Sequence, residues 1–218
     1  MTSPAAVWED PRRSPSTPLE QMNAITTPSP RTRLVLADVL PGAVARDVVL
    51  VVAGALLTAL LAQVTVPLHP VPVTGQTLAV GIVGATLGTR RGVAALALYL
   101  VLGFFLPFYA GGTSGISQLW GASGGYLWGF VLAAGAIGWL AERGSDSHVL
   151  TAFLAFVVAQ LLIFIPGVAV LHAVIGGSWG TAIHSGFTVF ILGGLIKAAI
   201  GGLVLPSAWS LVRRFERR

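Results

Sequence analysis

Charged residues are almost absent from the long middle part of this sequence, and that scarcity constrains the fold more than any other feature. Only 10% of the 218 residues are charged, whereas 55% are hydrophobic. A soluble domain usually carries charge on about a quarter of its residues. Between Asp47 and Arg213 the formally charged residues are Arg90, Arg91, Glu142, Arg143, Asp146 and Lys197. The composition therefore predicts an all-α integral membrane protein.

Apolar stretches of spanning length, about 20 residues for a helix, recur along the chain. Six transmembrane helices are predicted within one domain over residues 44–208, at about residues 48–66, 76–88, 92–108, 124–140, 149–175 and 185–205. The second is short for a span, and we expect the fifth to be interrupted at Pro166-Gly167. The Pro-rich stretch PLHPVPVTG, residues 67–75, is expected to be a non-helical loop.

The basic residues outside the spans fall on one side of this predicted bundle. They precede the first helix, join the second to the third and the fourth to the fifth, or follow the sixth: Arg31, Arg33, Arg46, Arg90, Arg91, Arg143, Arg213, Arg214, Arg217 and Arg218. The loops on the other side, PLHPVPVTG, YAGGTSGISQLWGA and GGSWGTAIH, contain no Lys or Arg. By the positive-inside rule, both termini are expected to be cytoplasmic. Arginine clusters at segment ends are topology signals, so no nucleic-acid partner is expected.

The two ends of the chain differ from its middle. Residues 1–43 hold seven of the 13 prolines and are predicted to be a flexible cytoplasmic tail. Its last part, LVLADVL at residues 34–40, is either a short interfacial helix or an extension without fixed structure. Residues 209–218 are predicted to be a basic cytoplasmic tail. The chain has no cysteine, which excludes disulfides, thiolate metal sites and cysteine nucleophiles.

Lys197 is the only lysine, and it lies in the apolar stretch GGLIKAAIGG, residues 193–202. An ionisable residue inside a span is costly, which makes it a candidate functional residue. Snorkelling suits a lysine near a helix end, and an ion pair needs a carboxylate, but no predicted span contains Asp or Glu. Lys197 is therefore predicted to bind an anionic ligand group or to face a wet cavity that holds one. A retinal-type Schiff base would need a carboxylate counter-ion, so no cofactor is expected.

The uncharged outer loops and the adjoining helix ends supply the other candidate binding groups. Hydroxyls and amides there offer donors and acceptors to a polar neutral ligand: Thr74, Gln76, Thr113, Ser114, Gln118 and Tyr126. Aromatic side chains can wall an apolar ligand part: Tyr109, Trp120 and Trp179. For Trp179, Trp128 and Tyr126 the alternative is an interfacial aromatic belt. No metal site is predicted.

Small residues recur at four-residue spacing, which lets helices approach closely. The pairs are Ala55 with Ala59, Gly84 with Gly88, and Gly125 with Gly129. Such pairs usually pack within a bundle, but the pair on the first helix is also a candidate for contact with another subunit.

Several stretches resemble the BioY family, whose members are biotin-specific substrate-binding (S) components of energy-coupling-factor (ECF) transporters. PVPVTGQTLAV (70–80), RRGVAALALYLVLG (90–103), LPFYAGG (106–112) and GASGGYLWGF (121–130) carry the resemblance, which covers about residues 46–205. It implies an ECF S-component-like bundle of six helices with cytoplasmic termini in a bacterial plasma membrane. It also implies a biotin pocket near the outer face, a transmembrane coupling subunit and two cytoplasmic ATPases as partners, and no enzyme activity. The chain has no Walker motif of its own.

The resemblance also assigns residues. In the family, the sixth helix carries a Gly-Asp-Leu-x-Lys-like stretch near the ligand, and here Gly193 to Lys197 reads GGLIK. Lys197 is implied to contact the valerate carboxylate or the ureido oxygen. Gly194 replaces an aspartate that would accept from the ureido N–H groups, so another acceptor must substitute or the ligand differs. Gln76, His172 or a backbone carbonyl is a candidate, and His172 is alternatively a packing residue. Ala55 and Ala59 match the family's contact to the coupling subunit.

Two other functions remain as alternatives. GASG at residues 121–124 and His184 resemble the serine and histidine of rhomboid intramembrane proteases, although GTSG at residues 112–115 matches the same weak pattern. Catalysis would need Ser123 and His184 within hydrogen-bond reach, whereas in a binding protein Ser123 is expected to be a helix cap. A carrier for biotin or a related ligand that works alone or as an oligomer would share the same pocket.

Overall fold

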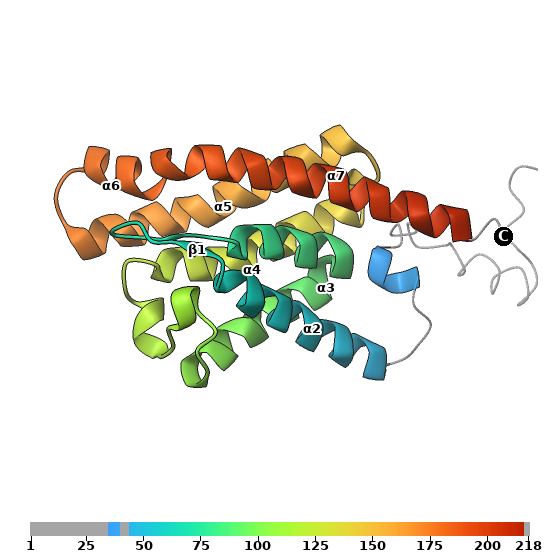
Figure 1. Ribbon diagram of the computed structural model, residues 1–218, viewed down its shortest axis with the longest axis horizontal. Helices are drawn as coiled ribbons and strands as arrows, with labels where there is room; N and C mark the ends of the chain where they lie inside the picture. The colour runs from blue at the N-terminus through green and yellow to red at the C-terminus, as the bar shows by residue number, and fades with distance from the viewer. Residues whose placement is uncertain (1–34, 40–43, 216–218) are drawn as a thin grey trace, which may run out of the picture. The chain divides into compact units, whose positions relative to one another are not determined.

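The computed structural model describes residues 35–39 and 44–215, and six α-helices dominate them (Figure 1). The helices are α2 Val44–Ala62, α3 Gln76–Phe105, α4 Gly124–Ala141, α5 Val149–Ile175, α6 Trp179–Gly186 and α7 Ile191–Phe215. Short 3₁₀ turns are η1 Leu36–Val39, η2 Ala110–Gly112, η3 Ile116–Leu119, η4 Ser145–Ser147 and η5 Thr188–Phe190. The predicted flexible tail, apart from residues 35–39, lies outside the described residues.

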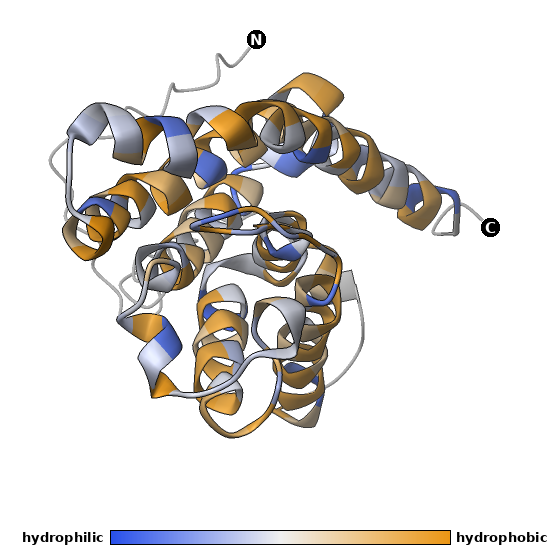
Figure 2. Ribbon diagram, turned by 60° about the vertical axis from the view of Figure 1, so that its left-hand side comes forward, coloured by the Kyte–Doolittle hydropathy of each residue, from blue (hydrophilic) through white to orange (hydrophobic). Residues whose placement is uncertain are grey.

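Five helical stretches among the described residues have the length and composition of membrane spans: Val44–Ala62, Gln76–Gly112, Gly124–Ala141, Val149–Ile175 and Trp179–Arg214. Hydrophobic residues cover most of each long helix (Figure 2), and large ones such as Leu60, Ile165 and Leu192 are exposed. In water such a surface would aggregate, whereas lipid solvates it. The predicted class, an all-α membrane protein, is confirmed. The count of six spans and the cytoplasmic termini stay predictions.

Two of the predicted spans, residues 76–88 and 92–108, lie within the single element α3. Gly88 breaks its helical geometry with φ 80° and ψ 177°, a conformation that favours glycine. A Cβ atom built on Gly92 would lie 3.0 Å from the Cα atom of Gly84. In a straight helix, residues eight apart lie about 12 Å apart at 1.5 Å rise per residue. The two arms of α3 therefore fold back against each other at Gly88.

The predicted interruption of the fifth helix is wrong, because α5 continues through Pro166. Proline costs one backbone hydrogen bond, but close neighbours in a membrane bundle can compensate for it. The helix α4 comes very close at this point, since a Cβ atom on Gly125 would lie 2.1 Å from the Pro166 carbonyl oxygen. The helix α5 therefore remains continuous at Pro166, where α4 packs closely against it.

The last predicted span has different bounds in the structure. The segment that was expected to begin near Ser185 is divided into α6, the turn η5, and α7. The helix α7 continues past residue 208 to Phe215, so most of the predicted basic tail is helical. Lys197 consequently lies in the second turn of α7, closer to its N-terminal end than the sequence suggested. The predicted loop 67–75 is non-helical; the short strand β1 Thr65–Val66 directly before it pairs antiparallel with β2 Val73–Thr74 within it.

The small-residue pairs pack within the bundle. A Cβ atom on Gly84 would lie 2.7 Å from the Ala134 carbonyl oxygen of α4, and one on Gly129 would lie 2.8 Å from the Ile163 Cα atom of α5. Ala55 and Ala59, which were expected to meet a coupling subunit, expose 0% and 5% of their surface. Both side chains are buried in this structure, and their contact with a coupling subunit stays a prediction.

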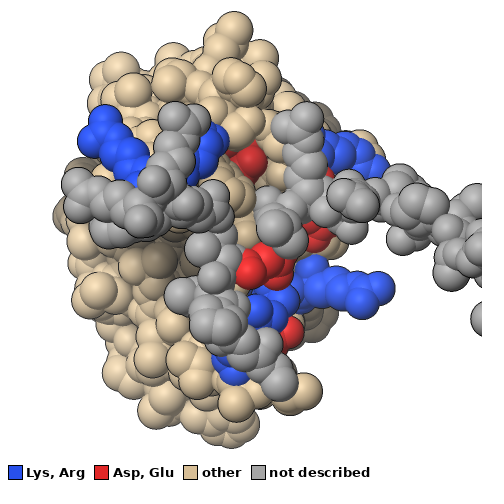
Figure 3. Space-filling view, turned by 90° about the vertical axis from the view of Figure 1, so that its right-hand side faces the viewer, with Lys and Arg blue, Asp and Glu red and all other residues tan. Residues whose placement is uncertain are grey.

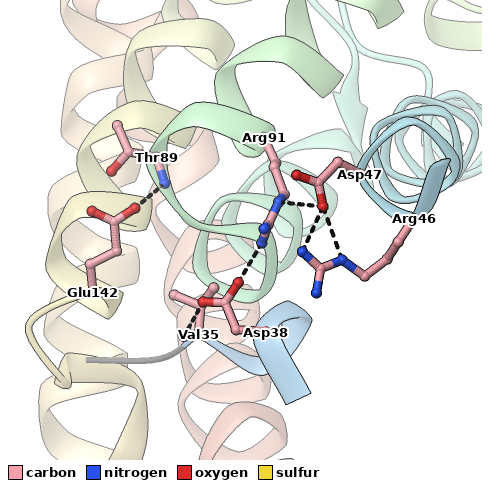
Figure 4. A network of polar contacts seen from close by, with 7 residues as sticks. All are labelled: Val35, Asp38, Arg46, Asp47, Thr89, Arg91 and Glu142. Carbon is pink, nitrogen blue, oxygen red and sulfur yellow. Dashed lines mark hydrogen bonds and ion pairs between the residues drawn. The ribbon is translucent and has the colours of Figure 1, made fainter. Parts of the chain in front are cut away.

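Ionic residues from several elements meet at one end of the described bundle (Figures 3 and 4). Arg91 pairs with Asp38 at 2.7 Å and with Asp47 at 3.2 Å, and Arg46 pairs with the same Asp47 at 2.8 Å. These pairs join η1, the start of α2 and the second arm of α3. Val35 and Ala37 beside them are buried against the protein. The segment that was predicted to be interfacial or without fixed structure is thus held to α3 over residues 35–39.

Candidate ligand-binding site

A cavity of about 300 Å³ opens among the loops and the helix ends that lie away from the ionic end of the bundle. Both the first arm of α3 and α4 run from this cavity to the ionic network. The lining residues are Pro70, Val71, Pro72, Thr74, Gln76, Thr77, Tyr109, Ala110, Thr113, Gln118, Ala122, Ser123, Tyr126, Leu127, Phe130, Gln160, Phe164, Phe190, Gly194 and Lys197. The volume lies at the lower end of the range for small-molecule sites, about 300–1,000 Å³.

Lys197 reaches this cavity from α7. Its Nζ atom donates to the Thr74 carbonyl oxygen at 2.5 Å and to the Thr77 Oγ1 atom at 3.0 Å. No carboxylate among the described residues pairs with it. An ammonium group has three donors, so these neutral partners leave one N–H and the whole positive charge uncompensated. Lys197 thus lines the cavity, and the prediction that it binds an anionic ligand group there is not tested by this geometry.

Gln76 lies at the start of α3, where its amide is held in a chain of hydrogen bonds. Thr74 donates through Oγ1 to the Gln76 Oε1 atom at 2.7 Å, and Gln76 donates through Nε2 to the Tyr99 hydroxyl at 2.5 Å. The Tyr99 hydroxyl donates in turn to the Phe108 carbonyl oxygen at 3.2 Å. This chain ties the loop 67–75 to the segment after α3, so Gln76 shapes the cavity as well as lining it.

Aromatic rings form the apolar wall. Tyr126 of α4 packs edge-on against Phe164 of α5, with ring centroids 6.0 Å apart, and lies 6.2 Å from the ring of Phe190. The Tyr126 hydroxyl donates to the Gly186 carbonyl oxygen at 2.8 Å, which fixes the ring. A rigid aromatic wall beside a few polar groups is the usual composition of a small-molecule pocket.

Of the residues that the sequence marked as candidate ligand-binding groups, the structure brings Thr74, Gln76, Thr113, Tyr126 and Lys197 together around the cavity, and their binding of a ligand stays a prediction. Gln118 and Tyr109, also named from the sequence, line it as well.

Four other candidates lie elsewhere: Ser114, Trp120, His172 and Trp179 are not part of the cavity wall. Trp120 is 70% exposed and packs on Trp128, and His172 stacks on Trp179 with ring centroids 3.9 Å apart. Trp120 and His172 thus pack against other aromatic rings and do not line the cavity.

Gln160 of α5 is the functional candidate that the sequence reading missed. It exposes 7% of its surface, it lines the cavity, and its Nε2 atom donates to the Gly194 carbonyl oxygen at 2.5 Å. An amide in the middle of an apolar helix was a signal that could have identified it.

The protease alternative is not favoured by the geometry. Ser123 lines the cavity, whereas His184 is exposed on α6, and no hydrogen bond joins the two side chains in the described part of the chain. Nor does Ser123 cap its helix as expected: it occupies the N-cap position of α4, but its side chain makes no capping hydrogen bond.

Comparison with protein families decides which group this bundle belongs to, because the BioY family model matches residues 29–214. The chain belongs to the BioY family. Its relatives include the biotin transporter BioY2 of Lactococcus lactis subsp. cremoris, which is 37% identical over 76% of this chain and 93% of its own length. The biotin transporter BioY of Thermotoga maritima is 38% identical over 66% of this chain and 83% of its own length.

A solved structure shares this fold. The crystal structure of the S-component for biotin from an ECF-type ABC transporter superposes with a TM-score of 0.67. The match covers 82% of this chain and 96% of that one, at 22% sequence identity. The chain is therefore a multi-pass membrane protein of a transporter family, with the fold of an ECF S-component.

Proposed function

We propose that this BioY-family protein is the membrane-embedded substrate-binding subunit of a biotin uptake system. The observation that carries the proposal is its similarity to a biotin transporter along 93% of that transporter's length, at 37% identity. The cavity supports it, because biotin combines a polar bicyclic urea with an aliphatic tail that ends in a carboxylate. The polar groups of Lys197, Gln76 and Thr74 suit the urea and the carboxylate of biotin. The aromatic wall of Tyr126 and Phe164 suits the aliphatic tail.

Lys197 is the residue through which the proposal is tested most directly. Its free N–H is matched to either acceptor of biotin, the carboxylate or the ureido oxygen. A charge-assisted hydrogen bond contributes about 1.5–3 kcal/mol. The Lys197→Ala variant is therefore expected to bind biotin roughly 10- to 150-fold more weakly in an equilibrium titration of the detergent-purified protein.

Two comparisons sharpen this titration. Ser207→Ala, on the exposed face of the same helix, is the matched control and should bind as wild type does. Biotinamide, which lacks the negative charge, shows whether Lys197 contacts the carboxylate or the ureido oxygen. If Lys197 binds the carboxylate, wild type should bind biotinamide more weakly than biotin. The Lys197→Ala variant should then bind the two ligands equally. Folded wild-type protein that fails to bind biotin would refute the proposal.

For transport, the proposal includes a transmembrane coupling subunit and two cytoplasmic ATPases in a bacterial plasma membrane, with both termini cytoplasmic. The similarity to an S-component fold supports this assembly, as does the absence of a Walker motif in the sequence. Uptake of labelled biotin should depend on co-expression of the coupling subunit and the ATPases. Undiminished uptake without them would instead favour the solitary carrier.

A further inference from the structure

The side chain of Gln160 is buried, and its acceptor oxygen Oε1 has no hydrogen-bond partner among the described residues. Among the described residues, four buried side-chain polar atoms have no hydrogen-bond partner: Thr89 Oγ1, Ser145 Oγ, Gln160 Oε1 and His172 Nδ1. Only Gln160 belongs to the cavity wall. A buried acceptor is costly when unmatched, so an orphan in the wall of a binding cavity indicates a ligand that brings a donor.

The orientation of the Gln160 amide follows from its partner. The carbonyl oxygen of Gly194 can only accept, so the Gln160 NH₂ group must face it. The Oε1 atom then remains without a hydrogen-bond partner among the described residues, although it lies as close to Gly194 as the Nε2 atom does. With its donor engaged on one side, the side chain presents its acceptor in a fixed position.

Gly194 makes room for this arrangement. A Cβ atom at position 194 would lie 3.0 Å from the Gln160 Oε1 atom and 3.1 Å from Nε2, which is tighter than an ordinary contact. Gly194 and Gln160 are thus complementary in shape: the glycine leaves space on α7, and the glutamine of α5 fills it. Lys197, one helical turn after Gly194, places an N–H donor on the same cavity wall.

We infer that Gln160 is a ligand-binding residue that accepts a hydrogen bond through Oε1 from an N–H group of the ligand. The inference rests on the proposed function, under which this N–H is one of the two ureido N–H groups of biotin. Gln160 would then select for a ligand that carries a donor, because a ligand without one leaves the buried acceptor unmatched.

The substitution that tests this role must keep the volume of the side chain. Gln160 also borders a small apolar recess between α5 and α7, which is lined by Val157, Leu161 and Leu195 among others. A truncation to alanine would join the recess to the cavity and confuse packing with hydrogen bonding. Methionine has a similar length and lacks the amide, so Gln160→Met is the informative variant. Gln63→Met, which replaces a glutamine directly after α2 and outside the cavity lining, is the matched control.

The experiment is a double-mutant-type cycle that compares wild type with Gln160→Met and biotin with its methylated analogues. Affinities are measured by equilibrium binding in detergent. The ligands are biotin and its analogues methylated on one or the other ureido nitrogen. For wild type, methylation of the nitrogen that faces Gln160 is expected to weaken binding roughly 10- to 100-fold. Gln160→Met is expected to bind biotin more weakly by a similar factor and to show less than about a threefold further loss on methylation. Gln63→Met should behave as wild type.

The outcomes separate the two proposals. Wild type that does not bind biotin refutes the proposed function, and the inference falls with it. Wild type that binds biotin and both methylated analogues equally well refutes the role of Gln160 alone, without recourse to any variant. The same conclusion follows if the loss on methylation persists in full in Gln160→Met, because the loss is then steric.

Discussion

The ammonium group of Lys197 donates a hydrogen bond to the backbone carbonyl of Thr74, which lies 123 residues earlier in the chain. This bond links α7 to the end of the loop 67–75, and the second bond to Thr77 extends the link to the first arm of α3. The cation therefore has two roles in this structure: it secures the loop that closes one side of the cavity, and it keeps a donor for a ligand.

Loss of this link should loosen the loop. In the ligand-free Lys197→Met variant, backbone amides of residues 67–75 are expected to exchange hydrogen faster than in wild type, because the Thr74 carbonyl loses its partner on α7. Hydrogen exchange followed by mass spectrometry measures this directly. Ser207→Ala is the control on the same helix. Unchanged exchange in Lys197→Met would show that the strand pair alone holds the loop.

Tyr99→Phe should destabilise the protein. Tyr99 is fully buried, and its hydroxyl joins Gln76 to the Phe108 carbonyl oxygen. Its removal leaves the Gln76 amide without this acceptor, so the free energy of unfolding is expected to fall by about 1–3 kcal/mol. Thermal unfolding in detergent measures the change.

The control for that measurement is Thr58→Val. It also removes a buried hydroxyl, but that hydroxyl bonds only to the Gly54 carbonyl within its own helix. A smaller loss is expected there, because a helical carbonyl also accepts the bond of the helix backbone. Equal losses in the two variants would contradict a special role for the Tyr99 link.

Glu142 should stabilise the bend of α3. Its Oε1 atom accepts from the Thr89 backbone N–H at 2.7 Å, directly after the break at Gly88 (Figure 4). A carboxylate at this position acts as a cap for the second arm, although it comes from α4. Glu142→Ala is expected to reduce stability by about 0.5–2 kcal/mol, as loss of a cap does.

Glu142→Gln tests whether the acceptor or the charge matters. The amide oxygen can still accept from Thr89, so this variant should retain more stability than Glu142→Ala in the same thermal unfolding assay. Equal stability of wild type and both variants would show that the bend needs no cap.

A substitution at Ala55 tests whether this residue serves packing within the bundle or contact with a partner subunit. Because Ala55 is fully buried, Ala55→Leu is expected to destabilise the isolated protein by about 1–3 kcal/mol through overpacking. The neighbouring Leu56 is exposed, and Leu56→Ala should change the stability by no more than about 0.5 kcal/mol. If the Ala55→Leu protein keeps wild-type thermal stability but has impaired uptake, the result would indicate that Ala55 contacts a coupling subunit.

Several features of this protein followed from its sequence alone. Scarce charge and long apolar stretches identified a membrane protein, and prolines identified the loop 67–75 as non-helical. The position of Lys197 among apolar residues singled it out, and the structure places it at the cavity with Thr74 and Gln76. These inferences succeeded because each depends on local chemistry: the cost of burying charge, and the backbone limits that proline imposes.

Other features were decided only by the tertiary structure. The sequence did not show that Ala55 is buried, that His172 is not part of the cavity wall, or that Gln160 is part of it. In a soluble helix an apolar stripe marks the buried face, but lipid and protein core are both apolar, so a membrane helix such as α5 has no such stripe. Which side of α5 faces the cavity is set by its close contacts with α4 and α7, and these form only in the folded bundle.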